Sequence, residues 1–499
     1  LAFDLGAESG RAMLGRFDGA RLSLHELHRF ANGAVRVRDS LHWDVLRLFG
    51  DIKHGLTLAS QHAITSIGLD AWGVDFALLD RDDHLIGNPF HYRDRRTDGM
   101  MLEAFRVVPR PEIFAQTGVQ FMPINTLYQL LAMSRAQSPA LQSAATLLMM
   151  PDLFNFWLTG RKVSEFTIAS TTQCYNPRER RWATTLLERL HIPSHIMPEI
   201  VPPATTLGAL LPSVAAETGL HSVHVIAPAC HDTAAAVAAV PTPQADFAYI
   251  SSGTWSLMGV EVAAPIITAA SLAHNFTNEG GIPAVRTAGT FGGTFRFLKN
   301  IMGLWLVQEC RRAWARANVG AGSPRPYKYD ELTRLAAAAP PLVSLIDPDD
   351  ERFLHPDDMP AAIRAYCAQS QQAVPDDHGA VVRCALESLA LKYRWTLERI
   401  EEMVGRRVNA IHIVGGGAQN RLLCQWTADA TGRLVMAGPS EATAIGNIVV
   451  QLIARGQLAS LAEGRGLVRR SFDLTTYEPR AADAWHEAYA RWLKLSRVT

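Results

Sequence analysis

The sequence predicts an α/β protein with two domains. Its 499 residues are too many for one hydrophobic core, and strand-like runs alternate with helix-like runs through most of the chain. Two segments almost half a chain apart, residues 1–17 and 247–262, each read as two apolar β runs around a turn rich in Gly and Ser. A Pro-rich stretch at 240–245 separates them, so we expect domains at 1–242 and 243–499.

The expected elements follow from local patterns. In the N-terminal half, a bend at Gly73 separates two strand-like runs, Gly160 ends a helix, and a short buried strand precedes His231. The elements expected there are strands at 63–69, 74–79 and 223–228 and helices at 125–134, 151–158 and 234–240. In the C-terminal half, apolar residues at helical spacing, such as Leu386 and Leu389, predict a long helix. The elements expected there are helices at 294–316, 381–404, 420–430 and 481–495 and a strand at 410–414.

Composition and charge argue against several classes of function. The chain has 48 basic and 48 acidic residues, which argues against a nucleic-acid-binding surface. No run of about 18 consecutive apolar residues occurs, so a membrane span is not expected. There is no signal-peptide pattern, and the six cysteines form no Cys-x-x-Cys pair. We therefore expect a reduced cytoplasmic protein without a zinc site, although Cys367 and Cys384 could be neighbours in the fold.

The turn of the first segment, residues 4–11, has the sequence Asp-Leu-Gly-Ala-Glu-Ser-Gly-Arg. Small residues leave backbone N–H groups free to face an anion, so the amides of residues 6–10 and the Arg11 side chain could surround phosphate oxygens, with Asp4 near a magnesium ion. The alternative is an ordinary hairpin with a surface Arg. Glu8 fits the phosphate interpretation poorly, because a carboxylate beside phosphate is repelled unless it points away or toward a metal.

The second turn, residues 251–255, offers hydroxyls and amides. Taken alone it could be a simple β-turn rich in Ser and Thr. A chain that builds this device twice is expected to hold a polyphosphate between two similar halves.

The segment His231-Asp232-Thr233 stands between a strand and a helix. Asp and Thr at such a junction are good helix N-caps, which is one explanation for Asp232. Residues at strand ends in α/β folds also face the ligand crevice, where a carboxylate could accept a proton from an attacking hydroxyl.

Other motifs are weaker by themselves. Three glycines at 415–417 follow a strand and open a helix, so a flat ligand or a phosphate could lie against the backbone there, with a structural turn as the alternative. Neither Gly-x-Gly-x-x-Gly nor a P-loop motif occurs, so dinucleotide and P-loop binding are not supported. Trp72, between Asp70 and Asp75, could stack on a sugar, or it could be a buried Trp beside surface acids.

Two further segments carry polar residues. Residues 92–97, Tyr-Arg-Asp-Arg-Arg-Thr, are dense in charge and could be a solvated loop. In the helix expected at 294–316, Asn300 and Gln308 stand two turns apart, about 12 Å along the axis. That span could bridge a sugar and a nucleotide, and a polar helix flank is the alternative.

Together these segments resemble the FGGY carbohydrate kinases, part of the actin/hexokinase/Hsp70-like superfamily, and the resemblance runs through essentially the whole chain. The matching strings are those at 4–11, 72–75, 92–94, 231–233, 251–258, 275–281, 298–305 and 412–417. Two of them, Trp-Ser-Leu-Met at 255–258 and Lys-Asn-Ile-Met-Gly-Leu-Trp at 299–305, point to members that act on L-rhamnulose.

The resemblance implies two RNase H-like (actin-like ATPase) domains flanking a nucleotide and sugar cleft, with ATP and Mg²⁺ as cofactors. The expected reaction is ATP-dependent phosphorylation of L-rhamnulose at O1 in L-rhamnose catabolism. A kinase for L-fuculose or xylulose and a non-catalytic actin-like nucleotide switch are the alternatives. The expected partners are a small-molecule ketose and ATP, with no nucleic acid and no membrane, and a monomer is favoured.

The resemblance also implies roles for particular residues. Asp232 looks like the proton acceptor and Asp4 like the magnesium-associated acid. Sugar contacts are implied for Gly73, His231, Thr233 and Asn300, and nucleotide contacts for Ala7, Glu8, Ser9, Gly10, Arg11, Thr254, Gln308 and Gly416. Ala7 stands where Thr is common in the wider family, so phosphate contact there should come from the backbone. The N-terminal domain is thus expected to hold the sugar, the first phosphate turn and the catalytic acid, and the C-terminal domain the nucleotide.

Overall fold

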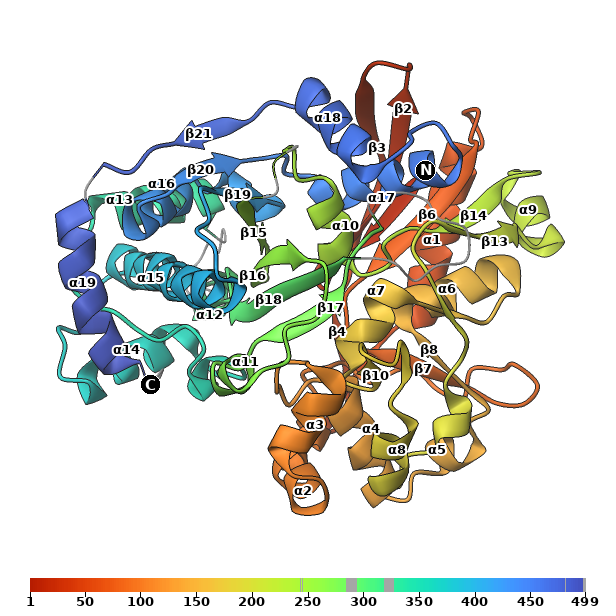
Figure 1. The fold of residues 1–499 in the computed structure, drawn as a ribbon, viewed down its shortest axis with the longest axis horizontal. Helices are drawn as coiled ribbons and strands as arrows, with labels where there is room; N and C mark the ends of the chain where they lie inside the picture. Colours follow the sequence, from red (N-terminus) through yellow and green to blue (C-terminus); the bar gives the residue numbers. More distant parts are fainter. Residues whose placement is uncertain (243, 245, 284–293, 318–326, 481, 497–499) are drawn as a thin grey trace. The chain divides into compact units, whose positions relative to one another are not determined.

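The computed structural model describes residues 1–242, 244, 246–283, 294–317, 327–480 and 482–496, and the chain divides into two compact units (Figure 1). The first unit comprises Leu1–Pro243, Glu261–Phe297 and Glu441–Phe472, and the second comprises Gln244–Val260, Leu298–Ser440 and Asp473–Thr499. Each unit combines a mixed sheet with helices, so the predicted two-domain α/β class is confirmed. The chain returns twice to the first unit, which a single boundary between residues 242 and 243 does not express.

The first unit is built on a sheet with strand order β13-β14-β6-β1-β2-β3. Its central strands, β14 (His224–Ala227), β6 (Ser66–Ala71) and β1 (Ala2–Leu5), are parallel. The outer strands, β13 (Thr205–Ala209), β2 (Ser9–Phe17) and β3 (Leu22–Ala31), pair antiparallel with their neighbours. The β1–β2 pair is the hairpin predicted at residues 1–17.

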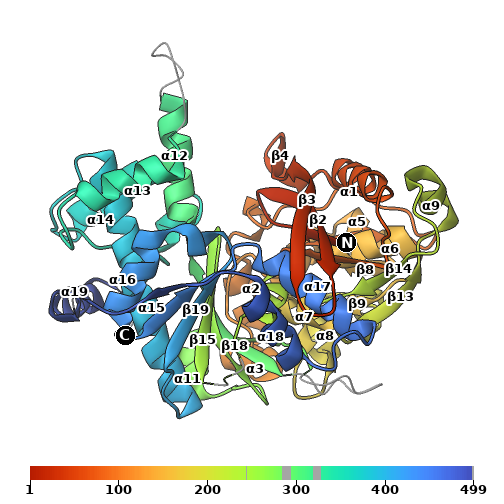
Figure 2. The ribbon, with the colours of Figure 1, turned by 90° about the horizontal axis from the view of Figure 1, so that it is seen from above.

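Helices cover both faces of this sheet. Since alternate residues of a strand point to opposite sides, neighbouring residues contact different helices. A Cβ at Gly68 would lie 2.3 Å from Asn447 Oδ1 on helix α17 (Ala442–Ala454), so the absence of a side chain lets this helix pack closely (Figure 2). On the other face, a Cβ at Gly55 of α1 (Val45–Ala59) would lie 2.8 Å from the ring of Phe3. The parallel strands end at one edge of the sheet, where Asp4 is in register with Asp70.

Shorter elements surround this sheet. The further helices of the first unit are α2 (Met100–Val107), α3 (Arg110–Thr117), α4 (Thr126–Arg135), α5 (Pro139–Ser143), α6 (Met150–Thr159), α7 (Phe166–Ala169), α8 (Thr184–Arg189), α9 (Pro212–Thr218), α10 (Asp232–Ala238), α11 (Ala269–Ala273) and α18 (Leu461–Ser471). The further strands are β4 (Ala34–Val37), β5 (Ser40–Trp43), β7 (Phe76–Leu79), β8 (Thr146–Met149), β9 (Ser164–Glu165), β10 (Tyr175–Asn176), β11 (Arg181–Trp182), β12 (Ile200–Val201) and β17 (Thr277–Gly280).

The second unit has a sheet in which strands follow the order β18-β16-β15-β19-β20-β21. The strands are β18 (Phe295–Met302), β16 (Trp255–Val262), β15 (Phe247–Ser252), β19 (Ala410–Val414), β20 (Leu434–Ala437) and β21 (Thr475–Tyr477). Strands β15, β19 and β20 are parallel, and β15 and β16 form the antiparallel pair predicted at 247–262. The helices are α12 (Trp305–Ala317), α13 (Tyr329–Ala338), α14 (Met359–Gln369), α15 (His378–Val404), α16 (Arg421–Thr431) and α19 (Ala482–Leu495).

Most predicted elements are confirmed within a few residues, including α4, α6, α10, α15, α16, β14 and β19. The helix predicted at 294–316 is wrong over its first half, because residues 295–302 form strand β18 and the helix starts at Trp305. The strand is buried on both faces, so its apolar residues do not alternate and resemble a helix stripe. The chain bends at Gly303, where a Cβ would lie 2.7 Å from the Ser256 amide nitrogen.

None of the helices in the described ranges is long and apolar enough to cross a membrane.

Candidate active site

Three aspartates of the first unit converge on the edge where its parallel strands end. Asp4 lies on β1 and is in register with Asp70 on β6. Asp232 is the first residue of α10, and a short segment, residues 228–231, connects it to the end of β14. An isolated parallel bridge between Ala71 and His231 joins the end of β6 to this segment. Asp4 and Asp70 are fully buried or nearly so, whereas the side chain of Asp232 is 29% exposed. This is the position at which α/β folds place ligands.

The three carboxyl groups disfavour one another's ionisation. Burial raises the pKa of Asp4 to about 6, and Asp232 and Glu441 add to the rise while Arg11 opposes it. Burial, followed by the charge of Asp4, raises the pKa of Asp70 well above its usual value. Burial also raises the pKa of Asp232, although His231 and the N–H of Thr233 act against it. Together the aspartates leave this edge with more acidic than basic groups.

Asp70 and Arg11 complete the edge. Asp70 Oδ2 accepts a hydrogen bond of 2.6 Å from the Asn447 side chain of α17, while no described residue is a partner of its buried Oδ1. Arg11 lies 3.4 Å from Asp4 Oδ2 and pairs with Glu441 at the start of α17. The Arg11 guanidinium is therefore already shared by two carboxylates rather than free at the surface.

The two glycines of the first Gly-rich turn lie in different surroundings. A Cβ at Gly10 would lie 2.2 Å from the ring of Phe30, so this glycine serves packing in β2 rather than the approach of an anion. At Gly6 a Cβ would meet only the Ser9 carbonyl oxygen, at 3.4 Å. Ala7, Glu8 and Ser9 between them are partly exposed.

The predicted sugar contacts of the first unit lie around Asp232. His231 Nε2 is 3.4 Å from Asp232 Oδ1, and Thr233 donates to the same oxygen from its amide at 2.6 Å and from its hydroxyl at 3.3 Å. A Cβ at Gly73 would lie 3.3 Å from both His231 Nε2 and Thr171 Oγ1. Gly73 therefore borders the same space as the imidazole and the carboxylate.

Helix capping does not account for Asp232. Helix α10 starts at Asp232 itself, and its N-cap residue is His231, whose side chain makes no cap hydrogen bond. The segment is held instead by buried Glu165, whose Oε2 accepts from the Cys230 amide at 3.0 Å. The His231 amide donates to Thr167 Oγ1 at 3.1 Å.

Trp72 is buried, as one alternative predicted, but the acids beside it are buried as well. Its indole ring lies 4.1 Å from that of Trp43, and both indole N–H groups donate to Asp75 Oδ2. Asp70 and Asp75 are both 0% exposed, so the prediction of surface acids is wrong. The solvated loop considered for 92–97 is also wrong for much of that segment, since Tyr92, Arg93, Asp94 and Thr97 are buried.

The predicted site residues of the second unit lie in the β15–β16 turn, after β19, on β18 and on α12. Thr254, in the β15–β16 turn, accepts from the amides of Gly303 and Trp305 through its carbonyl oxygen. Gly416 follows β19 and is exposed, and a Cβ there would meet nothing within 4 Å. Gln308 is on α12, and its buried Oε1 has no hydrogen-bond partner among the described residues. Asn300 is on β18, so the two-turn helical spacing predicted between Asn300 and Gln308 is wrong.

The glycines on either side of Gly416 are explained by close packing against the backbone and side chain of Ser252. A Cβ at Gly417 would lie 2.0 Å from the Ser252 hydroxyl oxygen, and one at Gly415, where φ is +83°, 3.1 Å from the Ser252 carbonyl oxygen. The structural-turn alternative thus explains these two, and Gly416 alone faces open space.

The cysteines are free and buried, and Cys367 on α14 and Cys384 on α15 are neighbours. A hydrogen bond from Cys384 lowers the pKa of the Cys367 thiol.

Sequence reasoning missed the residues that reach the site from distant segments. Glu441 and Asn447 contact Arg11 and Asp70 across 430 and 377 residues, respectively. Glu279 and Arg296 contact His231 from the far side of the imidazole. The string at 275–281 supported the family resemblance, but no local pattern assigns Glu279 a role.

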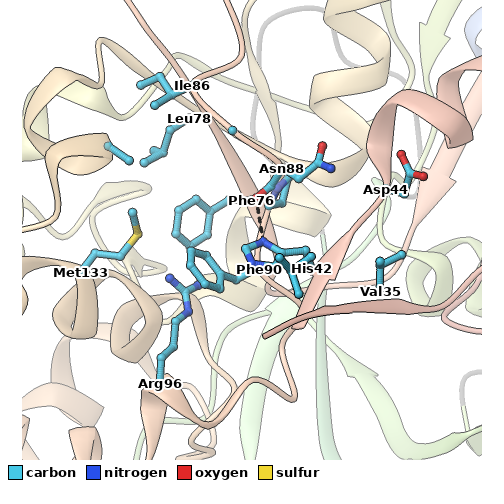
Figure 3. Close-up of a pocket in the computed structure, with 14 residues that line it drawn as sticks. Val35, His42, Asp44, Phe76, Leu78, Ile86, Asn88, Phe90, Arg96 and Met133 are labelled. Carbon is cyan, nitrogen blue, oxygen red and sulfur yellow. Dashed lines mark hydrogen bonds between the residues drawn. The ribbon is translucent and has the colours of Figure 1, made fainter. Parts of the chain in front are cut away.

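A cavity of about 440 Å³ lies apart from these residues, between the β4–β5 hairpin, β7 and α4 (Figure 3). Apolar side chains such as Phe76 and Met133 line most of it, and the Arg96 guanidinium lies 3.9 Å from the centre of the Phe90 ring. Asp75 and Asp94 already supply negative charge near Arg96, so the cavity has no unbalanced cation.

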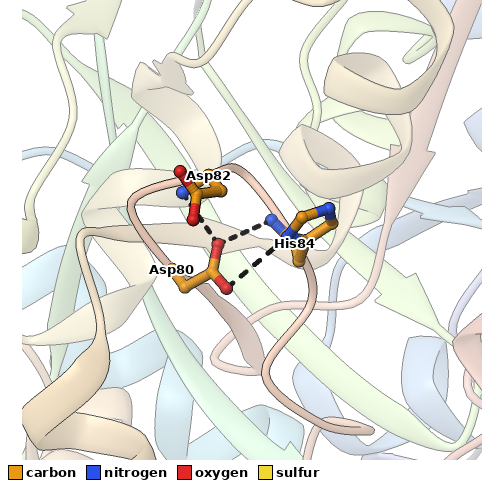
Figure 4. A group of neighbouring side chains, drawn as sticks. All are labelled: Asp80, Asp82 and His84. Atoms are coloured by element: carbon orange, nitrogen blue, oxygen red, sulfur yellow. Dashed lines mark hydrogen bonds and ion pairs between the residues drawn. The ribbon is translucent and has the colours of Figure 1, made fainter.

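Asp80, Asp82 and His84 also lie close together, in the turn after β7 (Figure 4). Asp80 Oδ1 accepts from the backbone amides of Asp82 and His84, both at 2.9 Å. These hydrogen bonds form the turn, and they explain the grouping without an ion.

Comparison with known proteins identifies the family. The sequence model of the N-terminal domain of the FGGY family of carbohydrate kinases matches residues 1–239, and that of the C-terminal domain matches residues 248–455. The chain belongs to the FGGY family of carbohydrate kinases. It is therefore an enzyme that phosphorylates a sugar, with ATP as the phosphoryl donor implied by the family.

Curated relatives match this FGGY kinase along nearly all of its length. A rhamnulokinase from Bacteroides thetaiotaomicron is 44% identical over 490 residues, which cover 98% of this chain and 97% of the relative. Rhamnulokinases from Pectobacterium carotovorum and Oceanobacillus iheyensis are 42% and 40% identical. Their alignments cover 100% and 96% of this chain and 96% and 97% of the relatives.

Solved structures share the fold of this FGGY kinase. A xylulose kinase from Lactobacillus acidophilus has a TM-score of 0.78 at 15% identity, covering 99% of this chain and 98% of the other. A glycerol kinase from Plasmodium falciparum, solved with ADP, has a TM-score of 0.74 at 13% identity, covering 99% and 96%. At these identities the likeness shows the fold alone.

Proposed function

We propose that this FGGY kinase transfers the γ-phosphoryl group of ATP to O1 of L-rhamnulose. The names of its relatives support the substrate, because each match covers almost the whole chain at about two-fifths identity or more. The observation that carries the chemistry is the carboxylate of Asp232, which stands at the end of parallel strands beside His231 and Gly73. Its raised pKa suits a group that must accept a proton.

Asp232 is proposed to take the proton late in the reaction. The pKa of an alcohol resembles that of water, near 16, whereas an ordinary Asp is near 4, a gap of about 12 units or roughly 16 kcal/mol. Even a raised Asp232 pKa closes only part of that gap, so a free alkoxide does not form first. Asp232 instead orients O1–H and accepts its proton as the O–P bond forms and the hydroxyl becomes acidic.

The neighbours of Asp232 have proposed roles that follow from their contacts. Thr233 donates two hydrogen bonds to Asp232 Oδ1, which leaves Oδ2 for the sugar hydroxyl. Gly73 and His231 border the same space and are proposed to hold other hydroxyls of the ketose. Asn300, on β18, is the proposed sugar contact of the second unit.

Nucleotide contacts are proposed on both units. In the first unit, the turn formed by Ala7, Glu8, Ser9, Gly10 and Arg11 is proposed to contact phosphates. In the second unit, the proposed contacts are Thr254, Gln308 and Gly416. Two observations support these contacts: a Cβ at Gly416 would meet open space, and the buried Gln308 Oε1 has no hydrogen-bond partner within the described ranges.

The crowded carboxylates fit a magnesium ion. Mg²⁺ prefers oxygen ligands. Asp4 and Asp70 are buried close together with raised pKa values, and Asp70 Oδ1 has no partner among the residues that the structure describes. Asp4 is the proposed magnesium-associated acid, with Asp70 beside it. The ion would supply positive charge against the phosphate oxygens, while Asp232 performs the proton transfer.

Steady-state kinetics with a panel of ketoses tests the proposal. L-Rhamnulose should give the highest kcat/KM, ahead of L-fuculose and D-xylulose, and the product should carry its phosphate on O1. Equal or greater efficiency with another ketose would contradict the substrate assignment and leave the kinase assignment standing.

A further inference from the structure

Two buried charged residues lie directly behind His231 in the first unit. Glu279 lies on β17 and is 3% exposed. Arg296 is 1% exposed and lies at the start of β18, in the part of that strand, up to Phe297, that belongs to the first unit. Glu279 Oε2 lies 3.2 Å from His231 Nδ1 and accepts a hydrogen bond of 3.0 Å from Arg296 Nη2. Arg296 is held in turn by Nε, which donates to the Gly280 carbonyl oxygen at 2.8 Å. Polar contacts thus run without interruption from Asp232 through His231 to Arg296.

We infer that Glu279 is a positioning residue for His231, an inference that rests on the proposed function of the Asp232 site. The Glu279 carboxylate accepts a hydrogen bond from Nδ1–H of His231. The opposite ring nitrogen, Nε2, then faces the space that Gly73 and Asp232 border.

The position of the proton follows from which groups can donate. Arg296 Nη2 also lies 3.3 Å from Nδ1, so distance alone leaves two arrangements. A guanidinium can only donate, and an ionised carboxylate can only accept. Without a proton on Nδ1, its lone pair would face the buried Glu279 oxygen at 3.2 Å. That contact is closer and more buried than the contact of Nε2 with the partly exposed Asp232 oxygen at 3.4 Å, so the proton is needed more on Nδ1. With the proton there, Nδ1–H and Arg296 both donate to one carboxylate, and these charge-assisted bonds are the stronger kind.

Glu279 keeps its charge despite its burial. Burial acts to raise the pKa of Glu279, but Arg296 and His231 outweigh it, so its pKa is lowered. An ionised acceptor behind the imidazole is what fixes the tautomer of a histidine.

The tautomer matters for the chemistry at Asp232. With the proton on Nδ1, a neutral imidazole presents a lone pair at Nε2, which can accept a hydrogen bond from a ketose hydroxyl. In the reversed tautomer, Nε2–H would point at Asp232 Oδ1, 3.4 Å away, and would stabilise the charged form of the proton acceptor. That would make Asp232 a weaker base.

Nitrogen NMR on the whole enzyme with ¹⁵N-labelled histidine measures the tautomer directly, with His231→Gln used to assign the signals. The wild-type enzyme is measured at about pH 8.5, two units above the ordinary histidine pKa of about 6.5. A proton on Nδ1 of His231 supports the inference. A bare Nδ1 with the proton on Nε2 overturns it, whatever the activity of the enzyme.

The variant Glu279→Gln tests the consequence. Its amide can donate to Nδ1 and accept from Arg296, so the tautomer should reverse, and kcat/KM for the ketose should fall by about 100-fold. Nucleotide affinity should stay within about twofold, and Glu279→Asp, which keeps a carboxylate, should recover part of kcat. Wild-type kcat in Glu279→Gln, or an unchanged tautomer, contradicts the inference.

Glu387→Gln is the matched control. Glu387 is also 1% exposed and accepts from Arg383 Nε at 2.7 Å. It belongs to the second unit, and none of its contacts with the described residues is with a histidine. It should lose comparable stability without losing kcat/KM or changing the His231 signals. If the wild-type enzyme prefers another ketose, the ketose panel contradicts the proposed substrate. The role of Glu279 is then still decided by the NMR result and by the kcat/KM of Glu279→Gln and wild type with the preferred ketose.

Discussion

Buried charges occur in both units, but they are balanced in opposite ways. In the first unit, Asp4, Asp70 and Asp232 crowd together, and the pKa of each is raised. In the second unit, Lys392 Nζ lies 3.0 Å from Asp347 and 2.9 Å from Asp349. Burial acts to raise the pKa of Asp349, but Lys392 and Lys299 outweigh it and lower that pKa.

The difference teaches that burial alone does not mark a functional carboxylate. In the second unit, Asp347 and Asp349 are paired with Lys392, which neutralises their charge, and they hold the fold together. Buried acids without a neighbouring cation have raised pKa values, and a proton or a metal ion can neutralise their charge. The paired acids of the second unit are suited to packing, and the crowded acids of the first unit are suited to chemistry.

The largest expected effect is the loss of turnover in Asp232→Asn. The amide cannot take the O1 proton, so kcat should fall by about 1,000-fold, within the range for general bases. Nucleotide affinity and the free energy of unfolding should stay near wild type. Steady-state kinetics and ATP titration check this, and near-normal kcat would end the assignment of Asp232 as proton acceptor.

Lys392→Met should break the ion pairs of the second unit. It leaves Asp347 and Asp349 buried without their main cation, which costs about 3–5 kcal/mol of unfolding free energy. Urea unfolding measures the loss, and Lys494→Met on the last turn of α19 serves as a surface control. A loss below about 1 kcal/mol, as found for exposed pairs, would mean that this cluster is not structural.

In the absence of metal, the free energy of unfolding should depend on pH through the buried acids of the first unit. The pKa values of Asp4 and Asp75 are raised to about 6 and that of Glu165 to about 7, with burial as the main cause in each. A raised folded-state pKa stabilises the fold below the unfolded pKa, and that stability is lost as pH rises through the folded value. With EDTA present, the free energy of unfolding should therefore fall as the pH rises from about 4 to about 7. A group whose pKa is raised by about two pH units contributes at most about 3 kcal/mol to this fall.

Asp75→Asn provides the check on this pH dependence. It removes one of the three groups and should flatten the fall measured in urea at several pH values. A fall that is unchanged in this variant would show that Asp75 keeps an ordinary pKa.

The smallest expected effect is that of Gly73→Ala. Its Cβ would press on His231 Nε2 and Thr171 Oγ1 at 3.3 Å and narrow the proposed sugar space. KM for the ketose should rise by about tenfold, or 1.4 kcal/mol, with ATP affinity retained. Isothermal titration with each ligand distinguishes this from misfolding, which would weaken both affinities equally.

The sequence predicts the catalytic edge because that edge is built from local patterns. Asp4 lies near the end of β1 and the 231–233 segment comes after β14, and strand ends are where such folds place their ligands. The partners of these residues could not be predicted, since Glu279, Asn447 and Glu441 arrive from segments far away in the chain. Asn300 was misplaced for a different reason, because a strand buried on both faces carries no alternating pattern.

The most direct test of the contrast between the units is to measure kcat with L-rhamnulose and the free energy of unfolding side by side in Asp232→Asn and Lys392→Met. We expect Asp232→Asn to lose turnover with little change in stability, and Lys392→Met to lose stability while its folded fraction keeps most of its kcat. Asp232→Asn that turns over normally, or that loses activity only in proportion to its unfolding, would contradict the account.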